Sequence, residues 1–298
     1  MTRKKQLLYI TGLFLVFLIL IPVIILYSMG YRLTSDFRIV ETGGIYFYEI
    51  KTNASVFMNG KLAKTSGILD RSLLVQNIKP GQYYVKIVKD GFHAWEKEVK
   101  VQEKEVEVCY PLLVPEKLEP VEIKKYISVA DNSVPGKKGK KTKWVLNDEY
   151  GEISGRFKTS WKPADNMFTR WYGKDKIKLK LGRFRKLRDK VLLTKEGNNL
   201  YVQWIGKKNQ LPFFINTMKK KIVYSPKGTI TAFDFYPDRD DSFIVRSDDG
   251  SLDAVELDTR FGGQNFYKIL RYCDRFIVES ETLFYTIGER IFYIDLNI

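Results

Sequence analysis

An unbroken apolar run near the start of the chain separates a short charged stub from a long region of alternating hydrophobic and polar positions. Residues Leu7 to Met29 contain no charged side chain and follow directly after Arg3, Lys4 and Lys5. A helix rises about 1.5 Å per residue, so this run covers roughly 34 Å, enough to cross a bilayer core. The pattern predicts a transmembrane helix over 7–29. Its flanking cations favour a cytoplasmic N-terminus and place the bulk of the chain outside the cytoplasm.

A cleaved signal peptide is the alternative reading of the same run. The small residues around Ser28-Met29-Gly30 have the spacing that a signal peptidase accepts. The apolar run is, however, much longer than the ~7–15 residues of a usual signal-peptide core. Pro22 does not exclude a spanning helix, because such helices tolerate a proline kink. An uncleaved anchor is favoured, and cleavage stays open.

Residues 45–110 alternate with a period near two and carry turn signals between the short runs. The dipeptide Asn59-Gly60 follows an apolar run and predicts a hairpin, because both residues tolerate positive φ. Tyr83 to Val88 alternates well enough for a half-buried strand, and Glu98 to Val101 does the same. No segment within 45–110 has helical periodicity over enough residues to predict a helix. Frequent aromatic and β-branched residues also favour strands over helices.

The order of these motifs resembles the PEGA domain, a small β-sandwich of bacterial envelope proteins. The chain departs from that family where Thr65-Ser66 follows the first hairpin and where Lys51 to Ala54 replaces the segment that gives the family its name. The resemblance implies a β-sandwich over about 65–70 residues, within the range of a small domain, with Trp95 and Tyr84 largely buried in it. The residues that carry it are Val56, Asn59-Gly60-Lys61, Lys64-Thr65, Pro80 to Ile87, Lys89 to Phe92, Trp95, Val99 and Val101.

Farther along the chain, pairs of apolar strands joined by Gly, Asp or Asn turns recur. The pairs cover 190–204, 242–258 and 275–296, and they return at roughly 40–50 residues, the period of propeller blades. This pattern resembles the degenerate β-propellers of TolB-like and WD-type proteins, as does the phrase Phe235 to Asp238. The length suits only about four blades, which implies a small or incomplete propeller.

The expected fold class is therefore mainly β, with a transmembrane helix, a PEGA-like β-sandwich and a propeller-like array of antiparallel strand pairs. The expected domain order is an anchor with its cytoplasmic stub over 1–30, a juxtamembrane linker over 31–44, the sandwich over 45–115 and the repeat region over 116–298.

The formal net charge of +15 favours anionic partners. Outside the cytoplasm these are lipid headgroups, wall polymers or acidic polysaccharides, although charge can also serve solubility alone. Two basic runs, 137–143 and 183–188, could contact such a polymer. The first interpretation is that 137–143 is a solvated loop and that 183–188 is a packed strand, and the second is that both contact an anionic polymer. The candidate contact residues are Lys137, Lys138, Lys140, Lys141, Lys143, Arg183, Arg185, Lys186 and Arg188.

Cysteine and histidine usage argues against a metal site or a catalytic triad. Cys109 and Cys273 lie far apart and are expected to be two buried apolar residues without a disulfide. His93 is the sole histidine, so no multi-histidine site can form, and it is expected in a surface turn. No cofactor is predicted.

A search for catalytic motifs finds no nucleophile elbow, zinc-protease motif, P-loop or dinucleotide fingerprint. Acidic residues gather at 238–241 and at Asp248-Asp249-Gly250, where glycoside hydrolysis or calcium binding is conceivable. Both clusters are interpreted as β-turns, because turns favour these residue types. Cations interleaved with aromatics around Trp161, 170–174 and 183–188 are interpreted as strand packing rather than base or sugar stacking.

The sequence thus predicts a membrane-anchored extracytoplasmic binding or scaffold protein of the bacterial envelope, in contact with membrane lipid through 7–29. Its further expected partners are anionic wall polymers or polysaccharides and other envelope proteins. An enzyme acting on envelope glycans is the alternative. An extracellular nucleic-acid-binding protein is the third reading, and nucleic acid is the least expected partner.

Overall fold

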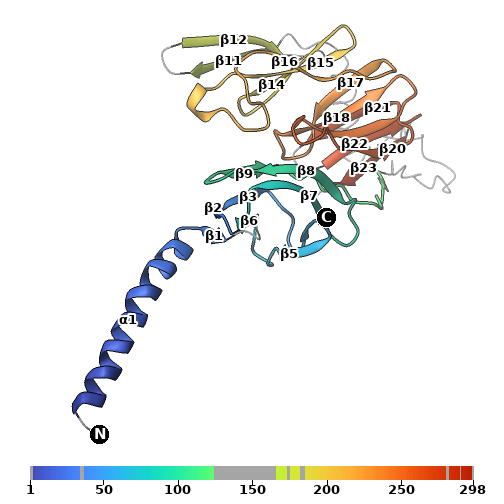
Figure 1. Ribbon diagram of the computed structural model, residues 1–298. Coiled ribbons are helices and arrows are strands. Elements are labelled where there is room, and N and C mark those ends of the chain that lie inside the picture. Colours follow the sequence, from blue (N-terminus) through green and yellow to red (C-terminus); the bar gives the residue numbers. More distant parts are fainter. Residues whose placement is uncertain are drawn as a thin grey trace, which may run out of the picture. The chain divides into compact units, whose positions relative to one another are not determined.

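The chain folds as a mainly β protein with one apolar helix at its N-terminus, which confirms the expected fold class (Figure 1). The computed structural model describes residues 3–33, 37–123, 166–172, 175–181, 185–279, 282–288 and 290–296. The chain divides into two compact units. One comprises Met1–Asp90 with Ala94–Pro111, and the other comprises Gly91–His93 with Leu112–Ile298.

The apolar run forms the helix α1 (Arg3–Ser28), which is 26 residues long and contains Pro22. Its segment Tyr9–Ser28 has a mean hydropathy of 2.9, and none of it is buried against the rest of the protein. Length and composition therefore suit a membrane span, and they also suit an N-terminal signal. The helix is followed by a small hairpin of β1 (Tyr31–Leu33) and β2 (Ile39–Glu41), within the stretch expected to be a linker.

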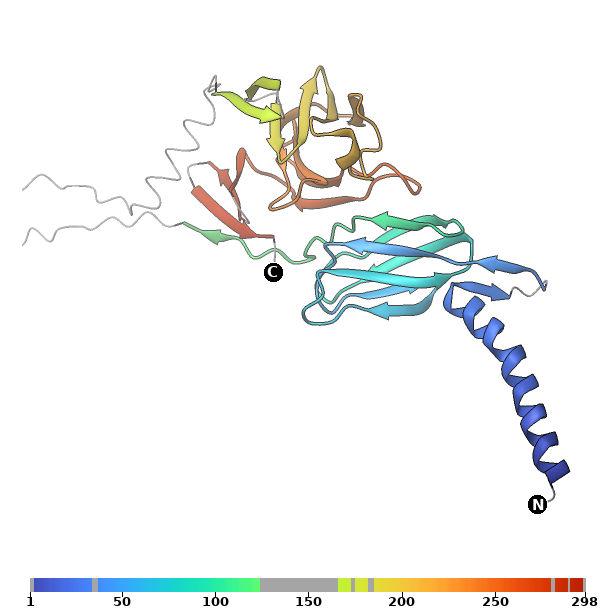
Figure 2. The same ribbon diagram turned by 90° about the vertical axis from the view of Figure 1, so that its left-hand side faces the viewer.

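The first unit is a sandwich of two sheets, seen nearly along its faces in Figure 2. One sheet has the order β5-β4-β7-β8 and the other the order β6-β3-β9, in which β3 and β9 run parallel. The strands are β3 (Gly43–Tyr48), β4 (Ser55–Met58), β5 (Lys61–Thr65), β6 (Ser72–Ile78), β7 (Gly81–Val88), β8 (Trp95–Val101) and β9 (Val106–Cys109).

The core of the sandwich forms where alternate side chains of the two sheets meet. Phe47 on β3 and Trp95 on β8 come from opposite sheets, and their rings pack edge to face with centroids 6.3 Å apart. Val85 and Ile87 on β7 are fully buried beside them. The predicted hairpin turn is present, because Asn59 and Gly60 both have positive φ. The period-two pattern thus buries one face of β7 and of β8, whereas the edge strand β5 is exposed throughout.

Tyr84 corrects one expectation drawn from the same pattern. The sequence suggested that Tyr84 and Trp95 would both be buried, but Tyr84 is 44% exposed. Because neighbouring residues of a strand face opposite sides, burial of Val85 and Ile87 sends Tyr84 to the solvent face. There its hydroxyl donates a short hydrogen bond to Glu96, which also accepts from Lys86.

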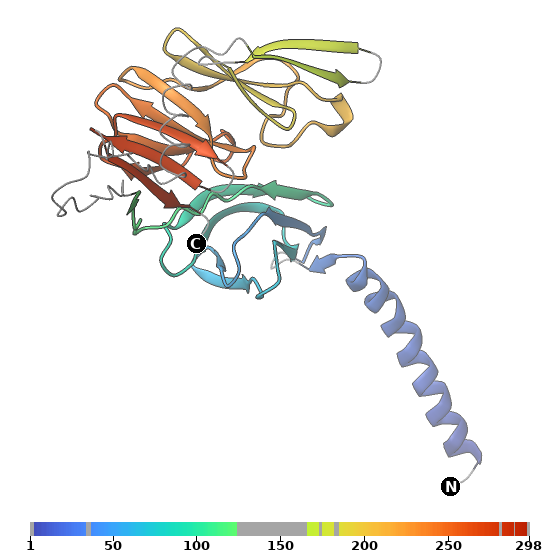
Figure 3. The ribbon, with the colours of Figure 1, turned by 180° about the vertical axis from the view of Figure 1, so that it is seen from behind.

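The second unit is built from successive four-stranded antiparallel sheets, seen from behind in Figure 3. Two of them follow the chain in order, as β13-β14-β15-β16 and β17-β18-β19-β20. A third has the order β10-β23-β22-β21, so a strand from the start of the unit completes the last sheet. The remaining described strands, β11 and β12, form a separate two-stranded sheet.

These sheets use short strands joined by tight turns, and the central strands β14 and β18 are buried at four consecutive positions. Gly250 ends the turn at Asp248-Asp249 with a φ of 84°, so this acidic cluster is a turn, as predicted. The elements are β10 (Val121–Glu122), β11 (Asn166–Tyr172), β12 (Asp175–Leu181), β13 (Arg185–Arg188), β14 (Val191–Glu196), β15 (Asn199–Trp204), η1 (Lys208–Gln210), β16 (Lys221–Tyr224), β17 (Ile230–Phe235), β18 (Ser242–Ser247), β19 (Leu252–Glu256), β20 (Phe266–Leu270), β21 (Arg275–Glu279), β22 (Thr282–Ile287) and β23 (Arg290–Asp295).

The strand placement within the predicted pairs is confirmed. Val191 and Leu193 lie on β14, Ile244 and Val245 on β18, and Phe292 and Ile294 on β23. Cys109 and Cys273 are both buried thiols that form no disulfide, as expected. Burial raises the pKa of the Cys273 thiol from its ordinary value of 9.0 to about 11, so it stays protonated and unreactive near neutral pH.

Candidate binding pocket

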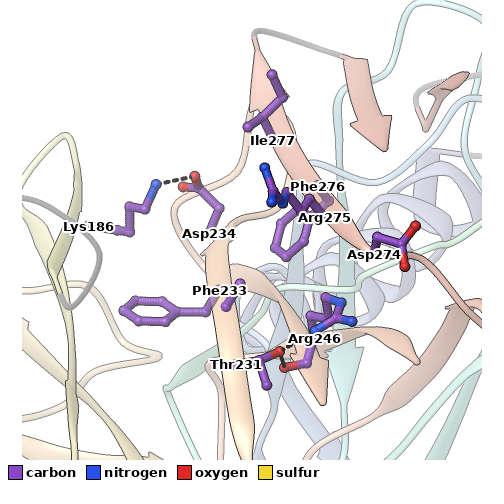
Figure 4. Close-up of a pocket in the computed structure, with 10 residues that line it drawn as sticks. Lys186, Thr231, Phe233, Asp234, Arg246, Asp274, Arg275, Phe276 and Ile277 are labelled. Carbon is purple, nitrogen blue, oxygen red and sulfur yellow. Dashed lines mark hydrogen bonds and ion pairs between the residues drawn. The ribbon is translucent and has the colours of Figure 1, made fainter. Parts of the chain in front are cut away.

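One edge strand from each four-stranded sheet of the second unit lies next to that of another, β13 beside β17 and β17 beside β21. Where they converge, a cavity of about 260 Å³ opens. Its lining combines charged and apolar side chains from four strands and one loop, drawn in Figure 4. The lining residues are Lys186, Thr231, Ala232, Phe233, Asp234, Arg246, Asp274, Arg275, Phe276 and Ile277.

One side of the pocket is held together by an ion pair between neighbouring sheets. Lys186 on β13 reaches Asp234 on β17 with a Nζ to Oδ2 distance of 2.6 Å, the contact dashed in Figure 4. Both side chains remain partly exposed, at 35% and 23%. A pair this accessible adds little to stability, because water screens it. It leaves both charges at the pocket wall.

Arg246 on β18 is fixed by bonds to two other segments. Its Nε donates to the Cys273 carbonyl at 2.8 Å, and its Nη1 donates to the Thr231 hydroxyl at 2.7 Å. The Thr231 hydroxyl in turn donates to the Arg246 carbonyl. These bonds hold the guanidinium plane in one orientation, and no described residue accepts from its Nη2. An arginine held in this way offers paired donors to an anion.

Asp274 and Arg275 form the third wall, at the start of β21. The Asp274 carboxylate accepts from the Tyr272 hydroxyl at 2.5 Å and from the Gly288 amide at 2.6 Å. These hydrogen bonds, and then the nearby Arg246 and Arg275, lower the pKa of Asp274. The carboxylate is therefore ionised at neutral pH and already uses its acceptors on the protein.

The two carboxylates of the pocket both have partners on the protein. A glycosidase needs one carboxyl group that keeps its proton near neutral pH. The pKa of Asp274 is lowered, so Asp274 is not placed as such an acid, and Asp234 forms the ion pair with Lys186. No group of acidic, cysteine or histidine side chains among the described residues gathers as metal ligands do. The pocket thus offers cations, an apolar wall and two engaged carboxylates.

Among the predicted polymer contacts that the structure describes, namely Arg185, Lys186 and Arg188, Lys186 alone lines this pocket. Arg185 is exposed on β13, while Arg188 donates to the carbonyls of Tyr236 and Arg239 and lies over the Phe235 ring. Arg188 therefore joins β13 to the segment after β17. The other candidates lie outside the described residues; they are Lys137, Lys138, Lys140, Lys141, Lys143 and Arg183.

Arg246, Asp274 and Arg275 were not singled out from the sequence. Each lies in or beside a short apolar strand, where a single charged residue is typical of a solvent-facing position. The weak signal available was position: Lys186, Asp234 and Arg275 each lie on an edge strand of a four-stranded sheet. Edge strands of neighbouring sheets can pack side by side, as β13, β17 and β21 do here.

The acidic cluster at 238–241 is also explained by structure. Asp241 is buried and accepts two hydrogen bonds from Arg239, at 2.7 and 2.6 Å. After β19, Asp258 and Arg260 form a similar pair. The two pairs lie at the same end of the β18–β19 hairpin, since the Leu257 amide donates to the Asp241 carbonyl. These carboxylates hold the ends of strands.

The sole histidine, His93, was expected in a surface turn. It is half-buried, and its ring stacks on the Tyr267 ring.

In the first unit, the loop before β4 accounts for two departures from the PEGA pattern. Asn53 takes a positive φ of 56°, a conformation that glycine adopts readily and asparagine tolerates. Ala54 after it is fully buried. The buried Ser66 hydroxyl donates to the Lys51 carbonyl and accepts from the Ala54 amide, each at 2.8 Å. Ser66 thus fixes this loop by side-chain hydrogen bonds.

Comparison with known proteins supports this reading of the first unit. No curated protein was found to match the chain. One segment of the chain does match the model of a known domain family. This segment runs from the loop before β4 past the end of β9 and includes none of residues 116–298. Domains of the matching family indicate a binding-type module of the extracellular or envelope compartment. Residues 49–113 of this chain match the PEGA domain family.

Proposed function

We propose that this protein is a membrane-anchored, extracytoplasmic binding protein of the bacterial envelope that takes an anionic group of an envelope polymer in the pocket between β13, β17 and β21. The observation that carries the proposal is the pocket itself. Lys186, Arg246 and Arg275 face Asp234 and Asp274 there, so the lining has one more cation than anion. The formal charge of +15 adds long-range attraction for an anionic polymer.

The size and lining of the pocket define the ligand class. A cavity of about 260 Å³ is near the lower end for small-molecule sites, which suits one sugar-sized unit rather than a large cofactor. The apolar surface of Ala232, Phe276 and Ile277 suits a sugar ring or short aliphatic segment. The cations suit its carboxylate or phosphate. An acidic sugar or phosphodiester unit of a polymer meets both demands.

The proposal includes a propeller-like arrangement of the sheets around the pocket. One edge strand of each successive antiparallel sheet lies beside the next, as the inner strands of propeller blades would around an axis. The early strand β10 pairs with the last strand β23 and so links the two ends of the unit. Ligand sites of repeat folds lie where the repeats converge.

Binding is tested with the full chain in detergent and two soluble polymers, a glycerol phosphate polymer and a polygalacturonate. Arg275→Gln is expected to weaken binding by about tenfold, because a hydrogen bond between charged groups is lost. The affinity is measured by calorimetry at low and at raised salt. Arg271→Gln is the matched control, since Arg271 is exposed and does not line the pocket. The control is expected to change affinity by less than about twofold.

The outcomes separate pocket binding from other readings. Equal weakening by both variants would replace the pocket with a diffuse basic surface, and no binding to either polymer would contradict the proposal. The same samples are assayed for cleavage of the polymer. Shortened polymer that requires the folded protein would favour the enzyme alternative.

Topology is tested independently in intact cells from which the wall has been removed. Leu69 is 93% exposed, whereas both native cysteines are buried, so Leu69→Cys presents one accessible thiol. A membrane-impermeant thiol reagent is expected to label this variant fully without lysis, while the unchanged chain stays unlabelled. Labelling only after lysis would contradict the extracytoplasmic location. The mass of the purified chain shows at the same time whether residues 1–28 are retained.

A further inference from the structure

A hairpin with an exposed apolar surface directly follows the apolar helix. Only Met29 and Gly30 separate the end of α1 from β1, and Leu33 on β1 pairs with Ile39 on β2. Leu33 is 56% exposed, Ile39 63% and Phe37 85%. Apolar side chains that gather in this way on a small element are unfavourable in water and mark a contact surface.

The hairpin is fixed to its neighbours rather than hanging as a free tether. The Thr42 amide and hydroxyl both donate to the Gly30 carbonyl, at 2.9 and 2.7 Å. Arg32 donates to the Asn77 side chain at 2.9 Å, and Lys79 donates to the Leu33 carbonyl at 3.0 Å. The base of the hairpin is therefore bonded to the end of β6 and the start of the turn after it.

Its charged and aromatic residues are those typical of a membrane–water interface. The Arg32 guanidinium lies 3.6 Å from the centroid of the Tyr27 ring at the end of α1. Exposed Arg38 stands between Phe37 and Ile39 in the sequence. Aromatic rings occur at headgroup depth in membrane proteins, and basic side chains attract anionic lipid. Apolar residues interleaved with cations match the two layers of that interface.

The chain length to the helix identifies lipid as the occupant in preference to a second protein. Leu33 is five residues beyond Ser28, so it lies within roughly 17 Å of the helix end even in full extension. If the apolar segment Tyr9–Ser28 spans a bilayer, its end is at the edge of the hydrocarbon core. The surface around Leu33, Phe37 and Ile39 then continues the apolar surface of the helix.

We propose that Leu33, Phe37 and Ile39 insert into the interfacial layer of the same bilayer that α1 crosses, while Arg32 and Arg38 meet lipid phosphates. This proposal rests on the membrane span of the proposed function and adds a second contact to it. Since the hairpin is bonded to Asn77 and Lys79, the insertion restricts how the sandwich tilts over the membrane. The protein is then held to the membrane by helix α1 and by the inserted side chains of Leu33, Phe37 and Ile39, which we call the wedge.

The test uses the full chain reconstituted in vesicles of phosphatidylcholine and phosphatidylglycerol, with a fluorescent label on one introduced cysteine. The native cysteines are buried, so Phe37→Cys, Leu69→Cys and Leu18→Cys each give a single labelled site. Quenching is measured with lipids that carry a nitroxide near the headgroup or near the end of the acyl chain. Leu69 is the matched control, because it is exposed and apolar yet precedes β6. That strand extends for roughly 20 Å between Ser72 and the Asn77 end.

The label at position 37 is expected to be quenched several-fold more strongly by the shallow nitroxide than the label at position 69. The label at position 18 is expected to respond to the deep nitroxide. Equal shallow quenching at 37 and 69, with deep quenching at 18, overturns the wedge and leaves the span intact. Loss of quenching at 18 overturns the span and the wedge together. A shielded label at 37 that no lipid nitroxide quenches shows protein on this surface and also overturns the proposal.

A second variant excludes insertion driven by the label itself. Leu33→Ser combined with Ile39→Ser, with the label kept at position 37, removes the native apolar neighbours. Shallow quenching is expected to fall to the level seen at position 69. Unchanged quenching in this variant contradicts a role for Leu33 and Ile39.

Discussion

Replacing Trp95 by alanine is expected to lower the free energy of unfolding of the first unit by about 3–5 kcal/mol. Trp95 is 1% exposed and packs edge to face against Phe47 of the opposite sheet, so it joins the two halves of the core. Truncation removes buried apolar area and leaves a cavity that the surrounding strands fill only in part. Hydrogen exchange of the amides of β3, β7 and β8 in the full chain reports the loss for this unit alone.

Tyr84→Ala is the control for this prediction. Tyr84 also lies in the β7–β8 pair but faces solvent, and its main contact is the hydrogen bond to Glu96. Its replacement is expected to change stability by about 0.5–1 kcal/mol. Similar exchange rates in the two variants would show that Trp95 does not hold the sheets together.

Replacing Asp241 by alanine is expected to destabilise the second unit by about 3–5 kcal/mol. The side chains of Asp241 and Arg239 are 2% and 11% exposed, and two hydrogen bonds join them. Removal of the carboxylate takes away both hydrogen bonds that the buried guanidinium donates to Asp241, which costs more than the pair itself contributes. Thermal unfolding and hydrogen exchange of β18 and β19 measure the loss.

A double-mutant cycle and an exposed pair test the origin of this effect. Arg239→Ala with Asp241→Ala is expected to lose less than the sum of the single changes, since no lone charge remains. Asp253→Ala breaks the more exposed pair with Lys268 in the same sheet and is expected to cost at most about 1 kcal/mol. Equal losses at Asp241 and Asp253 would contradict the role of burial.

Local sequence determined the elements whose cause is local. The apolar run of 7–29 forms helix α1, because a continuous apolar segment without charges has no other favourable structure of that length. Asn59-Gly60 forms its hairpin turn, because few other residues accept two consecutive positive φ values. The pattern around Val191, Ile244 and Ile294 placed these residues in strands, since each is a short apolar run rich in β-branched residues and bounded by turn residues.

The sequence said less about which face of a strand is buried, because an alternating pattern can be placed with either set of side chains toward the core. Tyr83 and Tyr84 are adjacent and similar, so the pattern does not say which one turns inward. Pairing with β8 decides it: Lys86 opposite Glu96 puts that face in solvent, and Tyr84 shares it. The partners of Arg188 were likewise not predictable from its own strand. It donates to the carbonyls of Tyr236 and Arg239, which lie in the segment between β17 and β18, far along the chain.

By itself the sequence determined a mainly β chain with an apolar N-terminal helix, a PEGA-like segment and strand-rich repeats. Only the tertiary structure decided the parallel pairing of β3 with β9, the return of β10 to β23, and the pocket. Lys186, Asp234 and Arg275 are far apart in the chain and meet through packing of successive sheets. Turns and periodicity depend on neighbours in sequence, whereas sheet partners and pockets depend on which distant surfaces exclude water together.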